Sequence, residues 1–143
     1  MDRYLVLQGP NLNRLGRRET EIYGADRLES LHEELAEWAG RLGVMLEFHQ
    51  SNHEGELIDA LQGAEGRCRG VVFNPGGFAH TSVALRDCIA GLDLPVVEVH
   101  LSNLHAREHF RRRSLCAAAT RGVICGLGVE GYKLALRHLM GEP

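Results

Sequence analysis

Residues 71–77 read VVFNPGG, an apolar run that stops at an asparagine, a proline and two glycines. A continuous β-branched and aromatic run is typical of a parallel strand that is covered on both faces. The turn-forming residues that follow predict that this strand, Val71–Asn74, ends at the asparagine. Four similar runs occur elsewhere in the chain, at Tyr4–Gln8, Val44–His49, Val96–His100 and Val123–Gly126.

Between these runs, apolar residues recur at helical spacing. The clearest stripe consists of Leu28, Leu31, Leu35, Trp38 and Leu42. Further helices are expected near 57–61, over 83–89 and 129–140, and a short one over Ala106–Ser114. Strands that alternate with helices predict a single α/β domain over residues 1–143. We expect a flavodoxin-like doubly wound sandwich with a five-stranded parallel sheet of order 2-1-3-4-5.

The composition limits the partners and the compartment. The 143 residues carry a formal net charge of −3, so no strongly basic surface favours nucleic acid. The first residues, MDRYLVLQ, lack the layout of a signal peptide, and no apolar run approaches the length of a membrane span. The four cysteines show no CxxC spacing and are expected as reduced thiols. We therefore expect a cytoplasmic protein with no nucleic-acid or membrane partner.

Polar segments follow the first, third and fourth predicted strands, at 9–13, 74–80 and 98–103. In a doubly wound sheet, ligands bind outside the carboxyl ends of the strands, where the strand order reverses. Glu98 and His100 stand two residues apart on a strand, so their side chains share a face. A carboxylate beside an imidazole fixes its tautomer and favours its charged form. Such a pair serves either catalysis or a structural ion-pair network.

The connection after the first strand, residues 9–24, is long for a βα loop, and such loops are often lids or binding loops. It contains Arg14, Arg17, Arg18 and Tyr23. Tyrosine has an ordinary pKa of about 10 and acts as a base near neutral pH only if cations stabilise the phenolate. The alternative is a solvated basic loop with an ordinary surface tyrosine.

A second basic segment, residues 107–113, contains four arginines and His109. Guanidinium groups bind carboxylates and other oxyanions through paired hydrogen bonds, so this segment is a candidate clamp for an anionic, hydroxylated substrate. The alternative is a solvated helix face, and we favour it for Arg112 and Arg113.

Two short motifs point to other chemistry but are weak. GLGVEG at 126–131 matches GxGxxG, yet only twelve residues follow it and no ribose-binding acid lies downstream. We interpret these glycines as a tight turn with close helix–sheet packing. HAREH at 105–109 matches HxxEH, but its arginine neighbours disfavour a bound dication. Lys133 is the only lysine and falls within the last helical pattern, which argues against catalysis through an imine.

Blocks that span nearly the whole chain resemble the type II 3-dehydroquinate dehydratases, in family order. They are GPNLNRLGRRE with IYG, QSNHEGELID, NPGGFAHTSVALRD, EVHLSN, AREHFRRRS and GVICGLGVEGY. Thr20 stands where many members have proline. The resemblance implies anti elimination of water from 3-dehydroquinate, through an enolate, to 3-dehydroshikimate. It also implies that no cofactor or metal is needed, and a role in the shikimate pathway of aromatic amino acid biosynthesis or in quinate catabolism.

The resemblance implies catalytic roles for five residues. Tyr23 would be the base, and Arg18 the cation that keeps it ionised. His100 would be the general acid, oriented by Glu98. Asn11 would position a water that holds the enolate oxygen.

Substrate-binding roles follow from the same resemblance. Asn74 would lie near the tertiary hydroxyl of the substrate. Backbone N–H groups of Leu101 and Ser102 would bind the carboxylate, as helix N-termini do. His80 and Arg111 would bind ring hydroxyls.

Two further residues connect the site to a lid and to a neighbouring subunit. Arg107 stands where the family has a second, lid-closing arginine. Asp87 matches an acid that reaches the site of a neighbouring subunit. The implied assembly is a homododecamer of four trimers, with 3-dehydroquinate as the small-molecule partner.

Two other classes of protein share this predicted fold. A non-catalytic α/β binding module would lack a paired base and acid around the switch point, whereas this chain has candidates for both. A flavin carrier would need a hydroxyl-rich phosphate loop after the first strand, and residues 9–14 do not supply one.

Overall fold

The computed structural model describes residues 1–17 and 27–141. Its strands form one five-stranded sheet, in which every paired neighbour is parallel and the order is β2-β1-β3-β4-β5. The strands are β1 Arg3–Gln8, β2 Met45–Gln50, β3 Val71–Asn74, β4 Val96–His100 and β5 Gly122–Cys125. This confirms the predicted fold class, strand order and, within about one residue, the strand boundaries.

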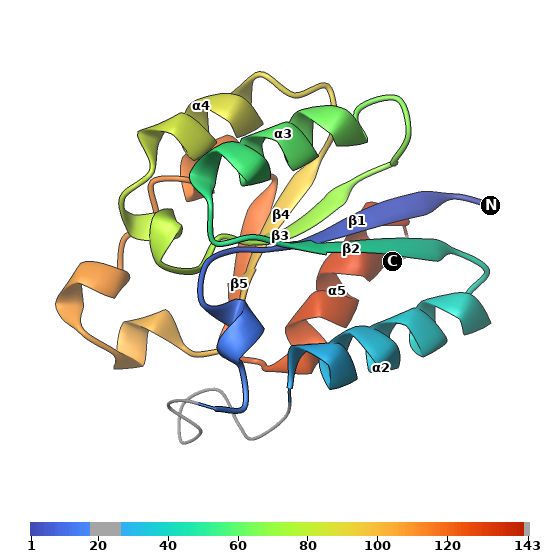
Figure 1. The fold of residues 1–143 in the computed structure, drawn as a ribbon, viewed down its shortest axis with the longest axis horizontal. Coiled ribbons are helices and arrows are strands. Elements are labelled where there is room, and N and C mark those ends of the chain that lie inside the picture. The colour runs from blue at the N-terminus through green and yellow to red at the C-terminus, as the bar shows by residue number, and fades with distance from the viewer. Residues whose placement is uncertain (18–26, 142–143) are drawn as a thin grey trace.

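Helices cover both faces of the sheet (Figure 1). One face carries α2 Leu28–Arg41 and α5 Val129–Leu139, and the other carries α3 Glu54–Ala64 and α4 Val83–Ala90. None of the helices in the described part of the chain has the length and apolar character of a membrane span.

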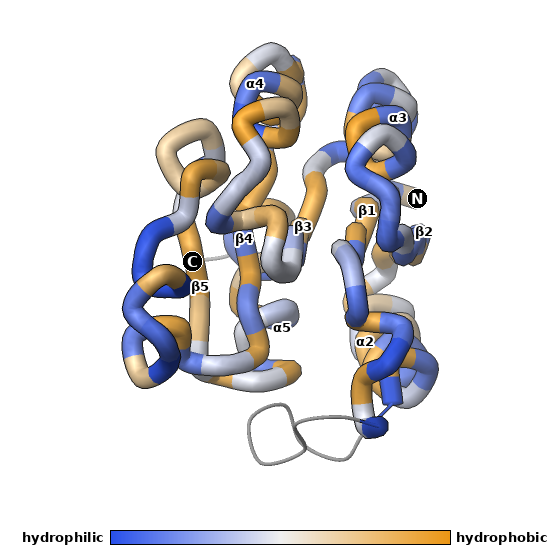
Figure 2. The backbone as a smooth tube through the Cα atoms, turned by 60° about the vertical axis from the view of Figure 1, so that its left-hand side comes forward, coloured by the Kyte–Doolittle hydropathy of each residue, from blue (hydrophilic) through white to orange (hydrophobic). Residues whose placement is uncertain are grey.

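Alternation of side chains along the strands divides the core into two layers. In β1, Tyr4 and Val6 pack on the layer of α2 and α5, while Leu5 and Leu7 pack on the layer of α3 and α4. All four are buried, as expected for a strand covered on both sides. Along β1 and β3 the tube is largely orange, whereas the helices mix orange and blue positions (Figure 2). Each face of a strand is therefore supported by a different pair of helices.

The segment that was expected to form one short helix at Ala106–Ser114 instead forms two 3₁₀ turns. These are η3, Leu104–Ala106, and η4, His109–Arg111. No residue from 105 to 114 is fully buried, so the segment has no apolar stripe that could hold a longer helix against the core. Further 3₁₀ turns are η1 Leu12–Arg14, η2 Gly76–His80 and η5 Ala117–Ala119.

The carboxyl ends of β1 and β3 meet so closely that one side requires glycine. The N–H of Gly9 donates to the carbonyl of Asn74 at 2.7 Å. A Cβ atom added to Gly9 would lie 2.5 Å from the carbonyl oxygen of Pro75. Gly76 has a φ of +58°, a conformation that glycine adopts without strain. The two strand ends, and the segments that follow them, are thereby held in one fixed arrangement.

We predict that Gly9→Ala lowers the free energy of unfolding by about 1–3 kcal/mol, because the two strand ends must separate to admit the methyl group. Urea denaturation at a fixed protein concentration measures this. Gly63→Ala is the matched control, since Gly63 lies in α3 with nothing within 4 Å of its added Cβ. The control should be neutral or stabilising by up to about 1 kcal/mol. Equal stability of the wild type and Gly9→Ala would show that the close approach imposes no constraint.

Candidate active site

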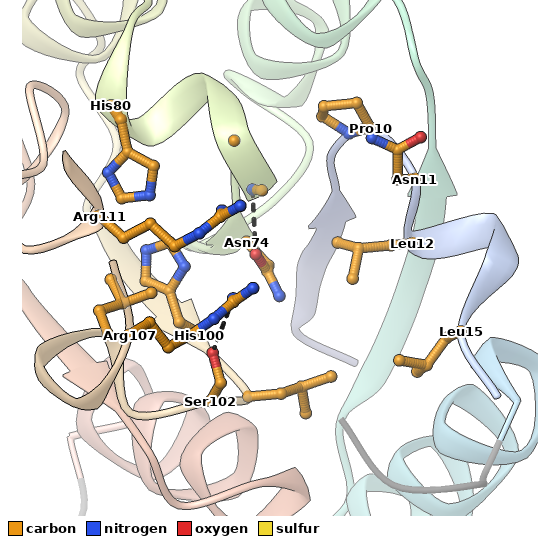
Figure 3. A pocket seen from close by; sticks show the side chains of 14 residues that line it. Pro10, Asn11, Leu12, Leu15, Asn74, His80, His100, Ser102, Arg107 and Arg111 are labelled. Carbon is orange, nitrogen blue, oxygen red and sulfur yellow. Dashed lines mark hydrogen bonds between the residues drawn. The ribbon is translucent and has the colours of Figure 1, made fainter. Parts of the chain in front are cut away.

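A cavity of about 170 Å³ opens at the carboxyl ends of β1, β3 and β4 (Figure 3). It lies where the strand order reverses between β1 and β3, as predicted for a doubly wound sheet. The side chains at its wall come from the segments that follow these three strands, and from η3 and η4. The fold therefore brings the polar segments at 9–13, 74–80 and 98–103 to a single site.

The end of β4 contributes a buried carboxylate–imidazole pair. Glu98 is fully buried, and its Oε2 lies 2.7 Å from Nε2 of His100. The other carboxylate oxygen, Oε1, accepts a hydrogen bond from the hydroxyl of Ser114 at 2.9 Å. Ser114 in turn accepts from the N–H of Ala117 at 3.1 Å. Because both carboxylate oxygens have partners, Glu98 is fixed and orients the imidazole with Nδ1 as the ring nitrogen available to a bound molecule.

The end of β3 contributes an amide that is held from both sides. The carbonyl oxygen Oδ1 of Asn74 accepts from the N–H of Gly76 at 3.1 Å. Its Nδ2 donates to the hydroxyl of Tyr132 at 3.0 Å. Asn74 lines the cavity although it is almost fully buried, so its amide presents a defined polar edge to the site.

The end of β1 contributes an asparagine in an uncommon backbone conformation. Asn11 has a φ of +69°, which asparagine tolerates better than most residues. Its N–H donates to Oδ1 of Asn52 at 2.9 Å, and the same oxygen accepts from Gln50 at 3.1 Å. The turn that follows buries Leu12 and Leu15, which form an apolar part of the cavity wall.

Two arginines form the basic wall of the cavity, and their side chains extend into it (Figure 3). Nη1 of Arg107 donates to the hydroxyl of Ser102 at 3.3 Å. Nε of Arg111 donates to Glu108 at 2.9 Å, and this hydrogen bond is the main reason why the pKa of Glu108 lies below its ordinary value. Leu101 and Ser102 line the same wall. The wall suits an anion with several oxygen atoms.

His80 completes the polar lining. Its Nδ1–H donates to the carbonyl of Arg113 at 2.8 Å, so Nε2 is the nitrogen that can accept from a bound hydroxyl. Its ring stacks near that of His100, with 6.3 Å between the ring centroids. Arg112 and Arg113 are exposed and do not line the cavity, in line with the solvated face favoured for them.

Several other residues singled out in the sequence are not among the described residues of this cluster. Tyr23 and Arg18 are outside the residues that the structure describes, as is Thr20. Asp87 is exposed on α4 and does not line the cavity. Lys133 forms an ion pair with Glu34 at 3.0 Å on the outer layer of helices. The described part of the chain therefore supplies most of the predicted site, but neither its proposed base nor a carboxylate from α4.

The two weak motifs have structural explanations. Gly126 has a φ of +89°, and a Cβ atom there would lie 3.0 Å from Cβ of Asn103, so it serves a tight turn. Gly131 packs α5 against Ile124 of β5. Within residues 1–17 and 27–141, no three side chains of His, Cys, Asp or Glu are grouped as metal ligands, and this includes the HxxEH segment.

Sequence reasoning missed two residues that hold predicted ones, and a third that holds one of these two. Ser114 holds Glu98, Tyr132 holds Asn74, and Gln8 accepts from the Tyr132 hydroxyl at 2.8 Å. Tyr132 lies on the buried face of an amphipathic helix, where a tyrosine is indistinguishable by pattern from an ordinary core residue. The one available signal was Gln8, a polar residue at the end of an otherwise apolar strand.

Comparison with known proteins gives one consistent relationship. The sequence profile of the family Dehydroquinase class II matches residues 2–140. The 3-dehydroquinate dehydratase of Bacillus pumilus is 57% identical over 142 residues, which are 99% of this chain and 97% of that protein. The type II dehydroquinase of Butyrivibrio crossotus has a TM-score of 0.95 at 40% identity, with 97% of each chain covered. That of Propionibacterium acnes has a TM-score of 0.94 at 41% identity, covering 99% of this chain and 98% of the other. The chain belongs to the class II dehydroquinase family.

Proposed function

We propose that the cavity at the strand ends binds 3-dehydroquinate and that its residues remove water from it by anti elimination through an enolate. The chain is a type II 3-dehydroquinate dehydratase, a hydro-lyase. One observation supports the proposed mechanism best: His100, held by the buried Glu98, lines the same cavity as Arg107 and Arg111. An acid and an anion-binding wall are thus available to one bound molecule.

Binding of the substrate uses the β4 side and the basic wall. The substrate carboxylate would accept hydrogen bonds from the backbone N–H groups of Leu101 and Ser102. Arg107, which already contacts the Ser102 hydroxyl, would close over the ligand. His80 and Arg111 would bind the ring hydroxyls. These groups orient the ring so that the carbon between the ketone and the hydroxyl-bearing carbon faces the base.

Proton abstraction would be the first chemical step. The phenolate of Tyr23, kept ionised by Arg18, takes the proton from this carbon. The C–H electron pair forms the enolate, and the ketone oxygen takes up the negative charge. A water positioned by Asn11 donates to that oxygen and stabilises it.

Loss of the hydroxyl group would complete the reaction. The enolate collapses to the ketone, a carbon–carbon double bond forms, and the tertiary C–O bond breaks. His100 donates its proton to the departing hydroxyl, which leaves as water. Proton transfer from Tyr23 back to His100, through solvent, restores both groups. Neither a metal nor a cofactor takes part in these steps.

The biological setting follows from this reaction. The product, 3-dehydroshikimate, belongs to the shikimate pathway of aromatic amino acid biosynthesis, and the same step also occurs in quinate catabolism. We propose that the protein carries out this step in the cytoplasm.

The proposed assembly is a dodecamer of four trimers in which each site borrows Asp87 from a neighbour. Asp87 is exposed on α4 and lies outside the cavity of its own chain, which supports such a role. Closed symmetric assemblies place the same surface residue in equivalent positions around every interface.

We predict that the purified protein converts 3-dehydroquinate without added metal or nucleotide. The absorbance of the conjugated product follows the reaction in the ultraviolet. Chelation should leave the rate unchanged, and borohydride added with substrate should neither inactivate the protein nor label Lys133. A rate that depends on zinc, magnesium, NAD or flavin, or inactivation by borohydride, would contradict the mechanism.

We predict that Tyr23→Phe abolishes turnover while a carboxylate product analogue still binds, because the hydroxyl is needed mainly in the transition state. Arg18→Ala should be nearly as damaging. Tyr4→Phe is the matched control, since Tyr4 is a core residue that does not line the cavity. Steady-state kinetics and calorimetric binding measure both effects. Retention of more than about a tenth of wild-type turnover by Tyr23→Phe, a loss below ~1.4 kcal/mol, would refute its assignment as the base.

We predict a particle near twelve times the chain mass of 15.8 kDa by light scattering. Asp87→Ala and Tyr23→Phe subunits, each impaired alone, should partly recover activity when they are co-assembled, because some sites then combine an intact Tyr23 with an intact Asp87. Arg112→Ala replaces Asp87→Ala in the control mixture. A fully active monomer, or confirmed co-assembly of the two variants without recovery of activity, would contradict the shared-site proposal.

A further inference from the structure

A chain of buried polar side chains leads from the cavity, between the sheet and its helices, to the half-buried His32. Asn74 Nδ2 donates to the Tyr132 hydroxyl at 3.0 Å, and that hydroxyl donates to Oε1 of Gln8 at 2.8 Å. Nε2 of Gln8 lies 3.3 Å from Nε2 of His32. Gln8 and Asn74 are paired in register on neighbouring strands, so their side chains point to the same side of the sheet.

The direction of each hydrogen bond in this chain is fixed by its ends. At the cavity end, the backbone N–H of Gly76 can only donate, so it holds the oxygen of the Asn74 amide and turns the NH₂ group toward Tyr132. The Tyr132 hydroxyl therefore accepts from Asn74 and donates to Gln8. The Gln8 amide then offers its NH₂ group to His32.

The far end of the chain supports the same direction. His32 stacks on Phe48, with 4.3 Å between the ring centroids. Burial lowers the pKa of His32 to about 4, so at neutral pH its imidazole is uncharged and can accept from Gln8. Burial also raises the pKa of Tyr132 to about 12, so its hydroxyl keeps the proton that it donates.

The orientation of the Asn74 amide has a chemical consequence at the cavity. A half-turn of an asparagine amide changes its shape little, but it exchanges a donor for an acceptor. With one N–H bound to Tyr132, the second N–H of Asn74 can reach a ligand, while the oxygen is occupied by Gly76. Donation to the oxygen of the departing hydroxyl would stabilise charge that develops as the C–O bond breaks.

We propose that Tyr132 is a positioning residue, which holds the Asn74 amide so that it presents an N–H donor to the tertiary hydroxyl of the ligand. Tyr132 does not line the cavity and acts only through Asn74. The identity of the hydroxyl rests on the proposed function.

The test compares two cyclic carboxylates that differ at the hydroxyl in question. Quinate carries the tertiary hydroxyl, and shikimate lacks it. In Tyr132→Phe the affinity for quinate should fall on the order of tenfold, as expected for one impaired hydrogen bond. The affinity for shikimate should change less than about twofold, because its other contacts remain. Calorimetry measures both, and the rate with 3-dehydroquinate is measured in parallel.

Two further variants make the test specific. Tyr4→Phe removes a tyrosine hydroxyl from the same core layer, and among the described residues this hydroxyl makes no hydrogen bond; it should leave both affinities unchanged. Gln8→Met removes the acceptor of the Tyr132 hydroxyl, whose proton is then left to compete with the Gly76 N–H for the Asn74 oxygen, so the amide is held less firmly. It should weaken quinate selectively, and it replaces Tyr132→Phe if that variant does not fold.

The outcomes separate this inference from the proposed function. Equal weakening of both ligands would indicate general loosening of the site and would overturn the positioning role, as would unchanged quinate binding. Selective weakening of quinate in a protein that does not dehydrate 3-dehydroquinate would refute the function while supporting the positioning role. Failure of the wild type to bind either acid would refute both.

Discussion

The hydrogen bond between Gly9 N–H and the Asn74 carbonyl, at 2.7 Å, fixes the point on which the site depends. It extends the pairing of β1 and β3 just beyond the sheet. After β1 the chain continues to α2 on one face of the sheet, and after β3 it continues to α4 on the other face. Only glycine fits at position 9, because the Pro75 carbonyl occupies the space of a side chain. Once these two strand ends are locked together, Asn11 and Asn74 must lie at one cavity, with His100 supplied by the next strand.

Buried polar groups at the end of an apolar sheet need hydrogen-bond partners within the protein. Buried polar groups without partners would cost on the order of 1–3 kcal/mol each, and a buried charge costs more. Glu98 meets this requirement through His100 and Ser114. Asn74 meets it through Gly76 and Tyr132. The side chains that make the cavity polar are therefore also the ones whose orientations are most strictly determined.

Ser114, which holds Glu98, and Tyr132, which holds Asn74, lie on different faces of the sheet. This follows from the geometry of the strands. Phe73 is the register partner of Glu98, and side chains alternate along a strand, so Glu98 and Asn74 point to opposite faces of the sheet. The residue that holds Glu98 lies beside the layer of α3 and α4, near the buried Cys116. The residue that holds Asn74 belongs to α5 in the other layer. The doubly wound arrangement thus lets each side of the cavity be fixed independently.

The sequence by itself predicted the strand order, through the alternation of strands and helices. It also predicted which polar segments meet at the strand ends, because apolar runs and the polar residues that end them are local features. It placed Glu98 beside His100 through the two-residue period of a strand. It did not predict the two 3₁₀ turns within residues 104–111. No apolar stripe holds a regular helix there. Only the tertiary structure decided that Tyr132 meets Asn74 and Gln8, and that Ser114 meets Glu98. These partners are far apart in the chain, and their contact depends on how each helix or turn is rotated against the sheet, which packing sets and no local pattern encodes.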